Sequence, residues 1–181
     1  CVRLINWPWE LVLANDSSLV DDWKWLASQA GLFGQISERS SILGPESVHI
    51  GSGTVIKPFV VIDAERGPVW IGRDVTVFPH SYIQGPAFIG DGSLLHPGSV
   101  VHSGTHIGPE SKVGGEIDNT VFQGYSNKQH NGFLGHSYVC SWVNIGADCT
   151  NSDLKNTYGT VRVPINGCEI ESEEVFVGMF M

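Results

Sequence analysis

The sequence lacks an excess of basic residues, a long apolar run and a secretory signal. Only 10 of its 181 residues are Lys or Arg, against 19 Asp and Glu, so the formal net charge is −9. A nucleic-acid interface needs clustered positive charge, and because no basic run occurs we expect no nucleic-acid partner. No apolar run is long enough to span a bilayer, so we expect no membrane partner and a cytoplasmic protein.

Two kinds of motif are also missing. The four cysteines, Cys1, Cys140, Cys149 and Cys168, form no CxxC pair and have no metal-ligand spacing. This predicts reduced thiols, with a disulfide or a cysteine nucleophile as the alternative. No Gly-rich nucleotide-binding motif occurs, so these residues cannot carry nucleotidyl transfer.

What the sequence does contain is a six-residue repeat between Ile71 and Asp118. The fifth position of most blocks is small or β-branched, and glycine often follows the first. The first position is always aliphatic: Ile71, Val77, Ile83, Ile89, Leu95, Val101, Ile107 and Val113. A repeat this short predicts an all-β solenoid in which three blocks close one triangular coil and the strands of successive coils pair in parallel.

Residues eighteen apart should then lie above one another inside the solenoid. The pattern predicts two internal ladders, Ile71, Ile89 and Ile107 in one and Val77, Leu95 and Val113 in the other. Each coil would be buried only by its neighbours, so stability would be nearly one-dimensional.

Residues 1–35 lack the repeat and are rich in tryptophan. Asp16–Ser18 can cap a helix, and Leu19, Trp23 and Leu26 share one helical face, which predicts a helix over about residues 18–29 that packs on the solenoid. An aromatic site that stacks a sugar or a base is the alternative.

The domain organisation follows from this division. We expect residues 1–35 to be a linker or helical segment and residues 36–181 to form the β-helix. The chain has no initiator Met and stops on the apolar run 175–181, which predicts a fragment whose β-helix is truncated at its C-terminal end.

Two polar stretches interrupt the later repeats about one coil apart, so they should lie close together. Irregular stretches on a regular scaffold commonly carry function. The first stretch holds Asn127, Lys128 and His130, and the second holds Asn144, Asp148, Asn151, Asp153 and Lys155. These side chains suit a polyhydroxy ligand, with or without a phosphate.

Three runs here carry a family resemblance: Glu116–Asn119, Ser126–Gly135 and Asn144–Ala147. They resemble the acetyltransferase domain of the bifunctional N-acetylglucosamine-1-phosphate uridylyltransferases/glucosamine-1-phosphate acetyltransferases, over about residues 50–160. Asn151–Asn156 looks closer to related sugar nucleotidyltransferases, in which a nucleotidyltransferase domain would precede residue 1. The resemblance implies a left-handed β-helix, acetyl-CoA as co-substrate, and a homotrimer with active sites between subunits.

The resemblance also implies roles for single residues. His130 would be the catalytic base that takes a proton from the sugar's 2-amino group as the nitrogen attacks the thioester. Ala147 would lie where the backbone approaches the CoA thioester. The substrate-binding residues that we expect are Lys128, Asn144, Asn151, Asp153 and Lys155, with no metal.

Three positions depart from the family's phosphate-binding pattern. Asp118 stands where the family has a Lys, Phe133 where it has a Tyr, and His96 where it has an Arg. Either the acceptor is not a sugar 1-phosphate, or Lys128, Lys155 or a partner subunit supplies the positive charge. Which amino sugar is the acceptor stays open.

Two other functions also stay open. One is a non-catalytic β-helix that trimerises or regulates an attached nucleotidyltransferase. For the trimer expected in either case, Trp142 and Phe122 are the candidate outward-facing subunit contacts. The other is a zinc site like that of the γ-type carbonic anhydrases, which share the fold. The histidines that invite this comparison take different repeat positions, which disfavours zinc: His80, His96, His102 and His106.

Overall fold

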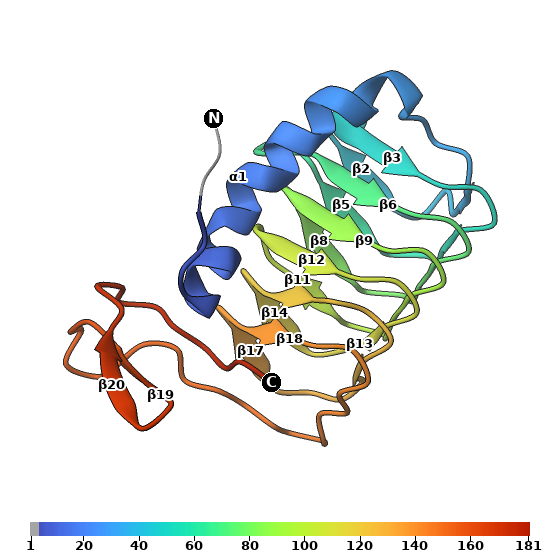
Figure 1. Ribbon diagram of the computed structural model, residues 1–181. Coiled ribbons are helices and arrows are strands. Elements are labelled where there is room, and N and C mark those ends of the chain that lie inside the picture. Colours follow the sequence, from blue (N-terminus) through green and yellow to red (C-terminus); the bar gives the residue numbers. More distant parts are fainter. Residues whose placement is uncertain (1–3) are drawn as a thin grey trace.

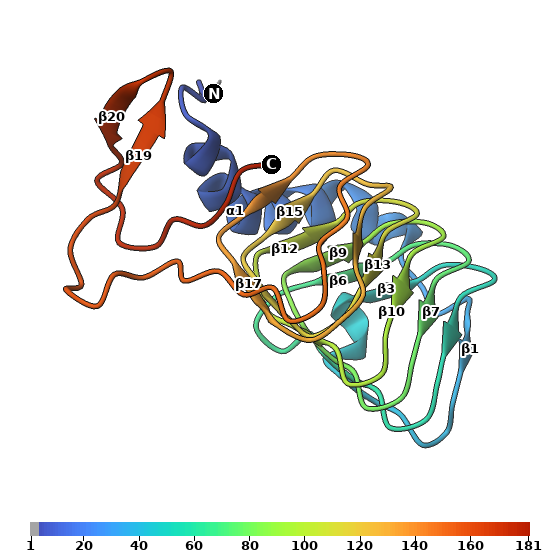
Figure 2. The ribbon, with the colours of Figure 1, turned by 90° about the horizontal axis from the view of Figure 1, so that it is seen from below.

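The computed structural model describes residues 4–181 as a helix that lies along a three-sided parallel β-solenoid (Figures 1 and 2). Helix α1 (Pro8–Leu26) continues as the 3₁₀ turn η1 (Ala27–Gln29), and a second 3₁₀ turn, η2 (Pro45–Ser47), lies between the first strands. The all-β left-handed β-helix expected from the hexapeptides and the family resemblance is confirmed. Within the described residues no helix is both long and apolar enough to cross a membrane.

Each side of the solenoid is one six-stranded parallel sheet. Sheet 1 contains β1 (Gln35–Ile36), β4 (Val55–Ile56), β7 (Thr76–Val77), β10 (Leu94–Leu95), β13 (Lys112–Val113) and β16 (Asn127–Lys128). Sheet 2 contains β2 (Ser41–Leu43), β5 (Val61–Asp63), β8 (Tyr82–Gln84), β11 (Val100–Val101), β14 (Glu116–Asp118) and β17 (Phe133–Gly135). Sheet 3 contains β3 (Val48–Ile50), β6 (Val69–Ile71), β9 (Ala87–Ile89), β12 (Thr105–Ile107), β15 (Val121–Phe122) and β18 (Tyr138–Val139).

The core consists of the two predicted ladders and their continuations. Ile89 pairs in register with Ile71 and Ile107, and Leu95 with Val77 and Val113. All these side chains are fully buried. The small fifth residues fill the corners, where the hydroxyl of Ser99 donates to the carbonyl of His96 at 2.6 Å. Each coil therefore closes its own corner and leaves its aliphatic side chains to the coils above and below.

Helix α1 begins ten residues earlier than predicted, at Pro8, and the expectation that Asp16–Ser18 would cap it is wrong. Proline is well suited to the first helical turn, and the Glu10 carboxylate accepts a hydrogen bond from the backbone N–H of Asn6 at 2.6 Å. Ser17 and Ser18 instead lie inside the helix, where both hydroxyls donate to the carbonyl of Ala14. The buried side chains of Trp9 and Val12 stabilise this early start by packing.

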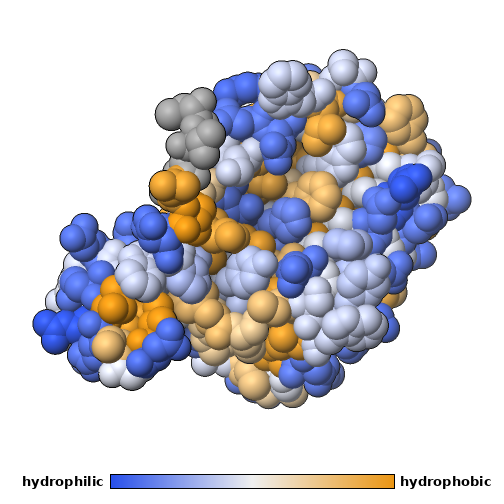
Figure 3. Space-filling view, in the orientation of Figure 1, coloured by the Kyte–Doolittle hydropathy of each residue, from blue (hydrophilic) through white to orange (hydrophobic). Residues whose placement is uncertain are grey.

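The helix covers the outer face of sheet 3 from end to end (Figure 1). Beneath it runs a column of residues paired in register, aromatic except for one valine: His49, Trp70, Phe88, His106, Val121 and Tyr138. Phe88 and His106 stack with ring centroids 4.6 Å apart, and Trp23 of the helix meets Trp70 edge-on. Trp9, which is buried, and Trp23 therefore serve the packing of helix on sheet, whereas Trp25 is exposed. Beside the start of α1 an apolar patch that includes Leu4 and Ile5 stays exposed (Figure 3).

The coils do not continue evenly to the end of the chain. After Ile145 the chain leaves the solenoid and forms an antiparallel hairpin of β19 (Arg162–Ile165) and β20 (Cys168–Glu171). It returns at Val177 and pairs Phe180 in parallel with Tyr138. The β-helix expected over residues 36–181 is therefore interrupted by this hairpin. Asn166-Gly167 forms a two-residue turn with φ of +49° and +81°, which favours a hairpin.

Two further expectations concern single side chains. Phe122 is fully buried inside the solenoid, so it is not an outward-facing subunit contact, whereas Trp142 is 81% exposed. Cys140, Cys149 and Cys168 are exposed free thiols, and Cys1 lies outside the described residues.

Candidate functional site

The predicted site residues lie on the last coils, where the solenoid becomes irregular. His130 lies at the corner between β16 and β17 and its side chain is exposed. Asn144 and Ala147 are also exposed, on the coil that follows, and Asn144 bridges in parallel to Asn127. The structure thus brings the His130 corner and Asn144 onto adjacent coils, as the sequence predicts.

Lys128 is placed differently from a ligand-binding lysine. It pairs in register with Val113, in the inward-facing ladder, and only 1% of its side chain is exposed. Its ammonium donates to the carbonyls of Gly114 at 2.8 Å, His130 at 3.2 Å and Gly132 at 2.8 Å. Burial lowers the pKa of this amine. All three donors are used within the protein, so Lys128 holds the backbone of the His130 turn.

A shortened corner explains why a lysine fits there. Val101 follows Leu95 after six positions, but the residues that stack on these two in the next coil, Val113 and Ile117, are only four positions apart. Gly115 takes the corner position that Ser99 takes in the preceding coil. A Cβ on Gly115 would lie 2.9 Å from the Lys128 ammonium, so the missing side chain leaves room for this group. The ammonium replaces the corner hydroxyl as the donor to the buried carbonyls.

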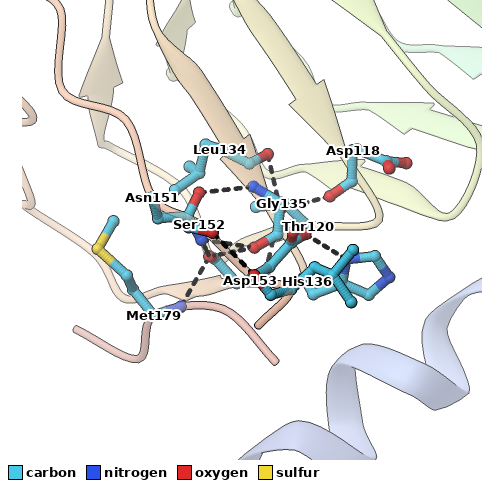
Figure 4. A network of polar contacts seen from close by, with 11 residues as sticks. Asp118, Thr120, Leu134, Gly135, His136, Asn151, Ser152, Asp153 and Met179 are labelled. Atoms are coloured by element: carbon cyan, nitrogen blue, oxygen red, sulfur yellow. Dashed lines mark hydrogen bonds and ion pairs between the residues drawn. The ribbon is translucent and has the colours of Figure 1, made fainter. Parts of the chain in front are cut away.

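Asn151 and Asp153 are mostly buried and bonded to the protein (Figure 4). The Asn151 side chain accepts from the N–H of Gly135 and donates to its carbonyl, both at 2.9 Å, and so imitates a pairing strand. The carboxylate of Asp153 lies 2.7 Å from Nδ1 of His136, whose ring stacks on Phe176. These contacts hold residues 151–153 against the last complete coil, at the point where the chain leaves the solenoid.

The outer face of sheet 2 next to this pair is acidic. Burial raises the pKa of the Asp118 carboxyl; the nearby His102 and His136 lower it and Asp153 and Glu116 raise it further. Glu116 already pairs with Nε2 of His102 at 3.0 Å. This is the position at which the family resemblance places a lysine for the sugar phosphate, so the face would repel an anion.

Lys155 lies at the start of the excursion, exposed, and its ammonium donates to the carbonyl of Thr160. It borders an open recess of about 510 Å³ that Asp153, Asn156 and Tyr158 also line. Two lysines expected to supply positive charge are thus bonded to backbone carbonyls.

A second hollow, of about 420 Å³, lies where sheet 3 turns into sheet 1, and the sequence analysis did not single it out as a site. Lys112, Asn127 and Asn144 line its floor, and Tyr125 and Trp142 form its rim. The available signal was two large aromatic residues at a corner position where the earlier coils have Gly53, Asp74, Gly92 and Glu110.

The four histidines of the zinc comparison have separate surroundings. His80 stacks on Phe59 and His106 on Phe88, while His96 lies 3.3 Å from Gln129 and His102 pairs with Glu116. Across residues 4–181 no three His, Cys, Asp or Glu side chains lie close enough together to hold a metal ion.

Comparison with known proteins adds the following. No family model matches the chain. A solved structure of a mutant of AntD, an N-acyltransferase from Bacillus cereus, covers 71% of this chain and 82% of its own at 11% identity, with a TM-score of only 0.29.

Sequence relatives are more informative. The bifunctional protein GlmU of Acidithiobacillus ferrooxidans is 30% identical over 125 residues, which cover 67% of this chain and 26% of that protein. GlmU of Desulfitobacterium hafniense is 28% identical over 148 residues, covering 70% and 33%. The chain therefore spans about a quarter to a third of the length of these relatives. The resemblance inferred from the motifs is confirmed: over most of its length the chain is similar in sequence to part of the bifunctional protein GlmU.

Proposed function

We propose that the chain is the acetyltransferase part of a GlmU-like enzyme and transfers the acetyl group of acetyl-CoA to the amino group of an amino sugar. The observation that carries the proposal is His130, an exposed imidazole on a corner whose backbone Lys128 holds in place, one coil away from the exposed Asn144. The similarity to GlmU over these coils supports the same assignment.

In this reaction His130 would take a proton from the sugar's 2-amino group. The nitrogen would then form a bond to the thioester carbonyl carbon, the bond from that carbon to sulfur would break, and the imidazolium would return its proton to the leaving thiolate to release CoA. An imidazole titrates near neutral pH, which suits a base that must be free at the start of each cycle. Asn144 would hold sugar hydroxyls and the backbone at Ala147 would approach the thioester.

The proposal extends to assembly and domain organisation. A homotrimer would place exposed residues such as Trp142 near a neighbouring subunit, and residues 1–35 would link the solenoid to a nucleotidyltransferase domain. Light scattering tests the first part, since a stable monomer would contradict it. The acidic face around Asp118 is the observation that favours the rival, a β-helix that assembles or regulates without catalysing.

An acetyl-transfer assay decides between the two. Purified protein would be incubated with acetyl-CoA and, in turn, glucosamine 1-phosphate, galactosamine 1-phosphate and the unphosphorylated amino sugars, with CoA release as the readout. We expect CoA release with at least one acceptor and its loss in His130→Ala. His80→Ala is the matched control, because His80 is also an exposed corner histidine. Activity absent with every acceptor, or unchanged in His130→Ala, would favour the non-catalytic solenoid.

A further inference from the structure

The corner hollow, defined by Glu110, Lys112, Tyr125, Asn127, Trp142 and Asn144, has features that the fold does not require. Tyr125 and Trp142 take left-handed backbone conformations, with φ of 54° and 67°. Bulky residues are rare there, and the equivalent corners of the earlier coils carry small or acidic residues, Gly53, Asp74, Gly92 and Glu110, so aromatic rings occur at this corner in the last two coils alone among the described residues.

The two aromatic rings gain little from the fold in return. They stack on one another with centroids 5.4 Å apart, yet Tyr125 is 49% and Trp142 81% exposed. A stacked pair that stays this exposed contributes little burial to stability. It does offer an apolar surface at the rim of a polar hollow, which is the combination that small-molecule sites use.

The floor of the hollow is one polar column. Lys112 pairs in register with Asn127, and Asn127 bridges to Asn144, so the three lie on successive coils about 4.8 Å apart. Among residues 4–181, Lys112 forms no ion pair. It is therefore the lysine near the site whose charge is free, since Lys128 and Lys155 both bind carbonyls.

We propose that the corner hollow binds the sugar ring of a phosphorylated amino sugar, with Lys112 bound to its phosphate. This inference rests on the proposed function. It names Lys112 as the source of the positive charge that the residues at the family's phosphate-binding positions, Asp118, Phe133 and His96, do not supply. Asn127 and Asn144 exchange hydrogen bonds with the ring hydroxyls, and the rings of Tyr125 and Trp142 cover its apolar C–H groups. The Glu110 carboxylate at the rim accepts from a hydroxyl and limits how much negative charge the hollow tolerates.

The position agrees with the catalytic assignment. Asn127 and His130 are three residues apart, so their Cα atoms lie at most about 11 Å from one another. A hexose ring spans about half of that distance, and its 2-amino group can point toward the His130 corner while the phosphate lies at Lys112. A free sugar 1-phosphate and a nucleotide sugar share this chemistry, and the hollow is open enough for either.

Calorimetric titration of the purified protein without acetyl-CoA tests the site. Glucosamine 1-phosphate, UDP-glucosamine and glucosamine are the probes. Lys112→Met should weaken the two phosphorylated probes about tenfold and glucosamine less than about twofold, because a charge-assisted hydrogen bond to phosphate is lost. Lys57→Met is the matched control, an exposed lysine next to β4 of the same sheet, and should change nothing. The phosphorylated probe that binds more tightly shows whether the natural ligand is a free sugar 1-phosphate or a nucleotide sugar.

The aromatic pair is tested separately. Trp142→Leu should weaken all three probes about tenfold, whereas Trp25→Leu, at an equally exposed tryptophan of α1, should not. Two results would overturn the assignment. One is a Lys112→Met protein that binds the phosphorylated probes as tightly as the wild type. The other is a Trp142→Leu protein that binds all three probes like the wild type and differs only in the mass of its assembly in light scattering. Binding that follows this pattern without any acetyl transfer would reject the proposed function alone. Acetyl transfer with an unchanged KM in Lys112→Met would reject this site alone.

Discussion

The coils between Val48 and Val139 and the segment from Cys140 to Met181 differ in how they are held together. In the coils, inward residues such as Ile50, Ile71 and Ile89 are fully buried and each strand pairs with its equivalents above and below. The last segment makes one long excursion with an antiparallel hairpin and returns only at Val177.

Side-chain hydrogen bonds replace ladder contacts in the last segment. Asn151 pairs with the backbone of Gly135, and Asp153 with the imidazole of His136 (Figure 4). The comparison teaches that the coils carry stability, and that the residues with free chemistry gather where the repeat is interrupted. The four variants below all lie in the coils, and they compare a regular ladder position with positions on the last coils, where the repeat is interrupted.

The largest effect should come from the regular coils. Ile89→Asp would place an unpaired carboxylate among the fully buried side chains of Ile71 and Ile107, and a buried charge without a partner costs several kcal/mol. Because each coil is buried by its neighbours, we expect loss of the folded protein, seen as insoluble expression or absent β-sheet circular dichroism. Ile89→Val, which keeps the ladder, should cost only about 1 kcal/mol. A folded Ile89→Asp protein with wild-type thermal unfolding would refute the one-dimensional account.

The second effect should appear in activity and not in stability. His130→Ala removes an exposed side chain from a corner that Lys128 holds through the backbone carbonyl, which the substitution leaves in place. We expect acetyl transfer to fall by about 10²–10⁴-fold, the usual contribution of a general base, with the unfolding midpoint unchanged. A parallel loss of activity and thermal stability would mean that His130 acts through the fold.

Sequence reasoning predicted the repeat well because its signal recurs many times. Every aliphatic first position from Ile71 to Val113 faces inward, and both ladders have the predicted register. It failed where one residue does something its neighbours do not. In the sequence, Lys128 is one polar residue in a polar stretch. Only the structure, through the shortened corner at Gly115, shows that its ammonium points inward.

The early helix and the hairpin were missed for other reasons. The start of α1 depends on burial of Trp9 and Val12 against a sheet distant in sequence, which local propensity does not reveal. The hairpin had a local signal, Asn166-Gly167 between alternating residues, that the expectation of further coils overrode. For the candidate site, the His130 corner and Asn144 were foreseeable from motifs. Lys112 was not, because its role depends on which lysines the fold leaves unpaired.

A smaller effect should appear where the repeat is first interrupted. Lys128→Met removes the donor to three buried carbonyls, which costs about 1–3 kcal/mol, partly offset because a desolvated ammonium is also removed. The pKa of Lys128 is lowered in the folded protein, so between that value and the ordinary 10.5 the unfolded chain binds more protons. Stability of the wild type should therefore rise with pH across this window, relative to Lys128→Met. Urea unfolding of both proteins between pH 8 and about 10.5 measures the difference. Identical pH dependence would show that the amine is not desolvated.

The smallest effect should come from the acidic face of sheet 2. Burial raises the pKa of Asp118 above its ordinary value of 3.8, so the folded state disfavours the carboxylate, and stability is lost as pH rises from 3.8 through the raised pKa. Asp118→Asn removes that charge and should raise the free energy of unfolding at pH 7 by up to about 1 kcal/mol, with no gain at pH 3.5. Glu116→Gln is the control, because this exposed carboxylate already pairs with His102 and its loss should not stabilise. Chemical unfolding at both pH values measures the two variants. Since Lys112 and not this face is expected to bind the phosphate, Asp118→Asn should also leave the affinity for glucosamine 1-phosphate within about twofold of wild type, because the charge removed lies outside the binding site. A tenfold gain in affinity would instead place the phosphate beside Asp118, at the corner between sheets 2 and 3 and not at the corner of the aromatic pair.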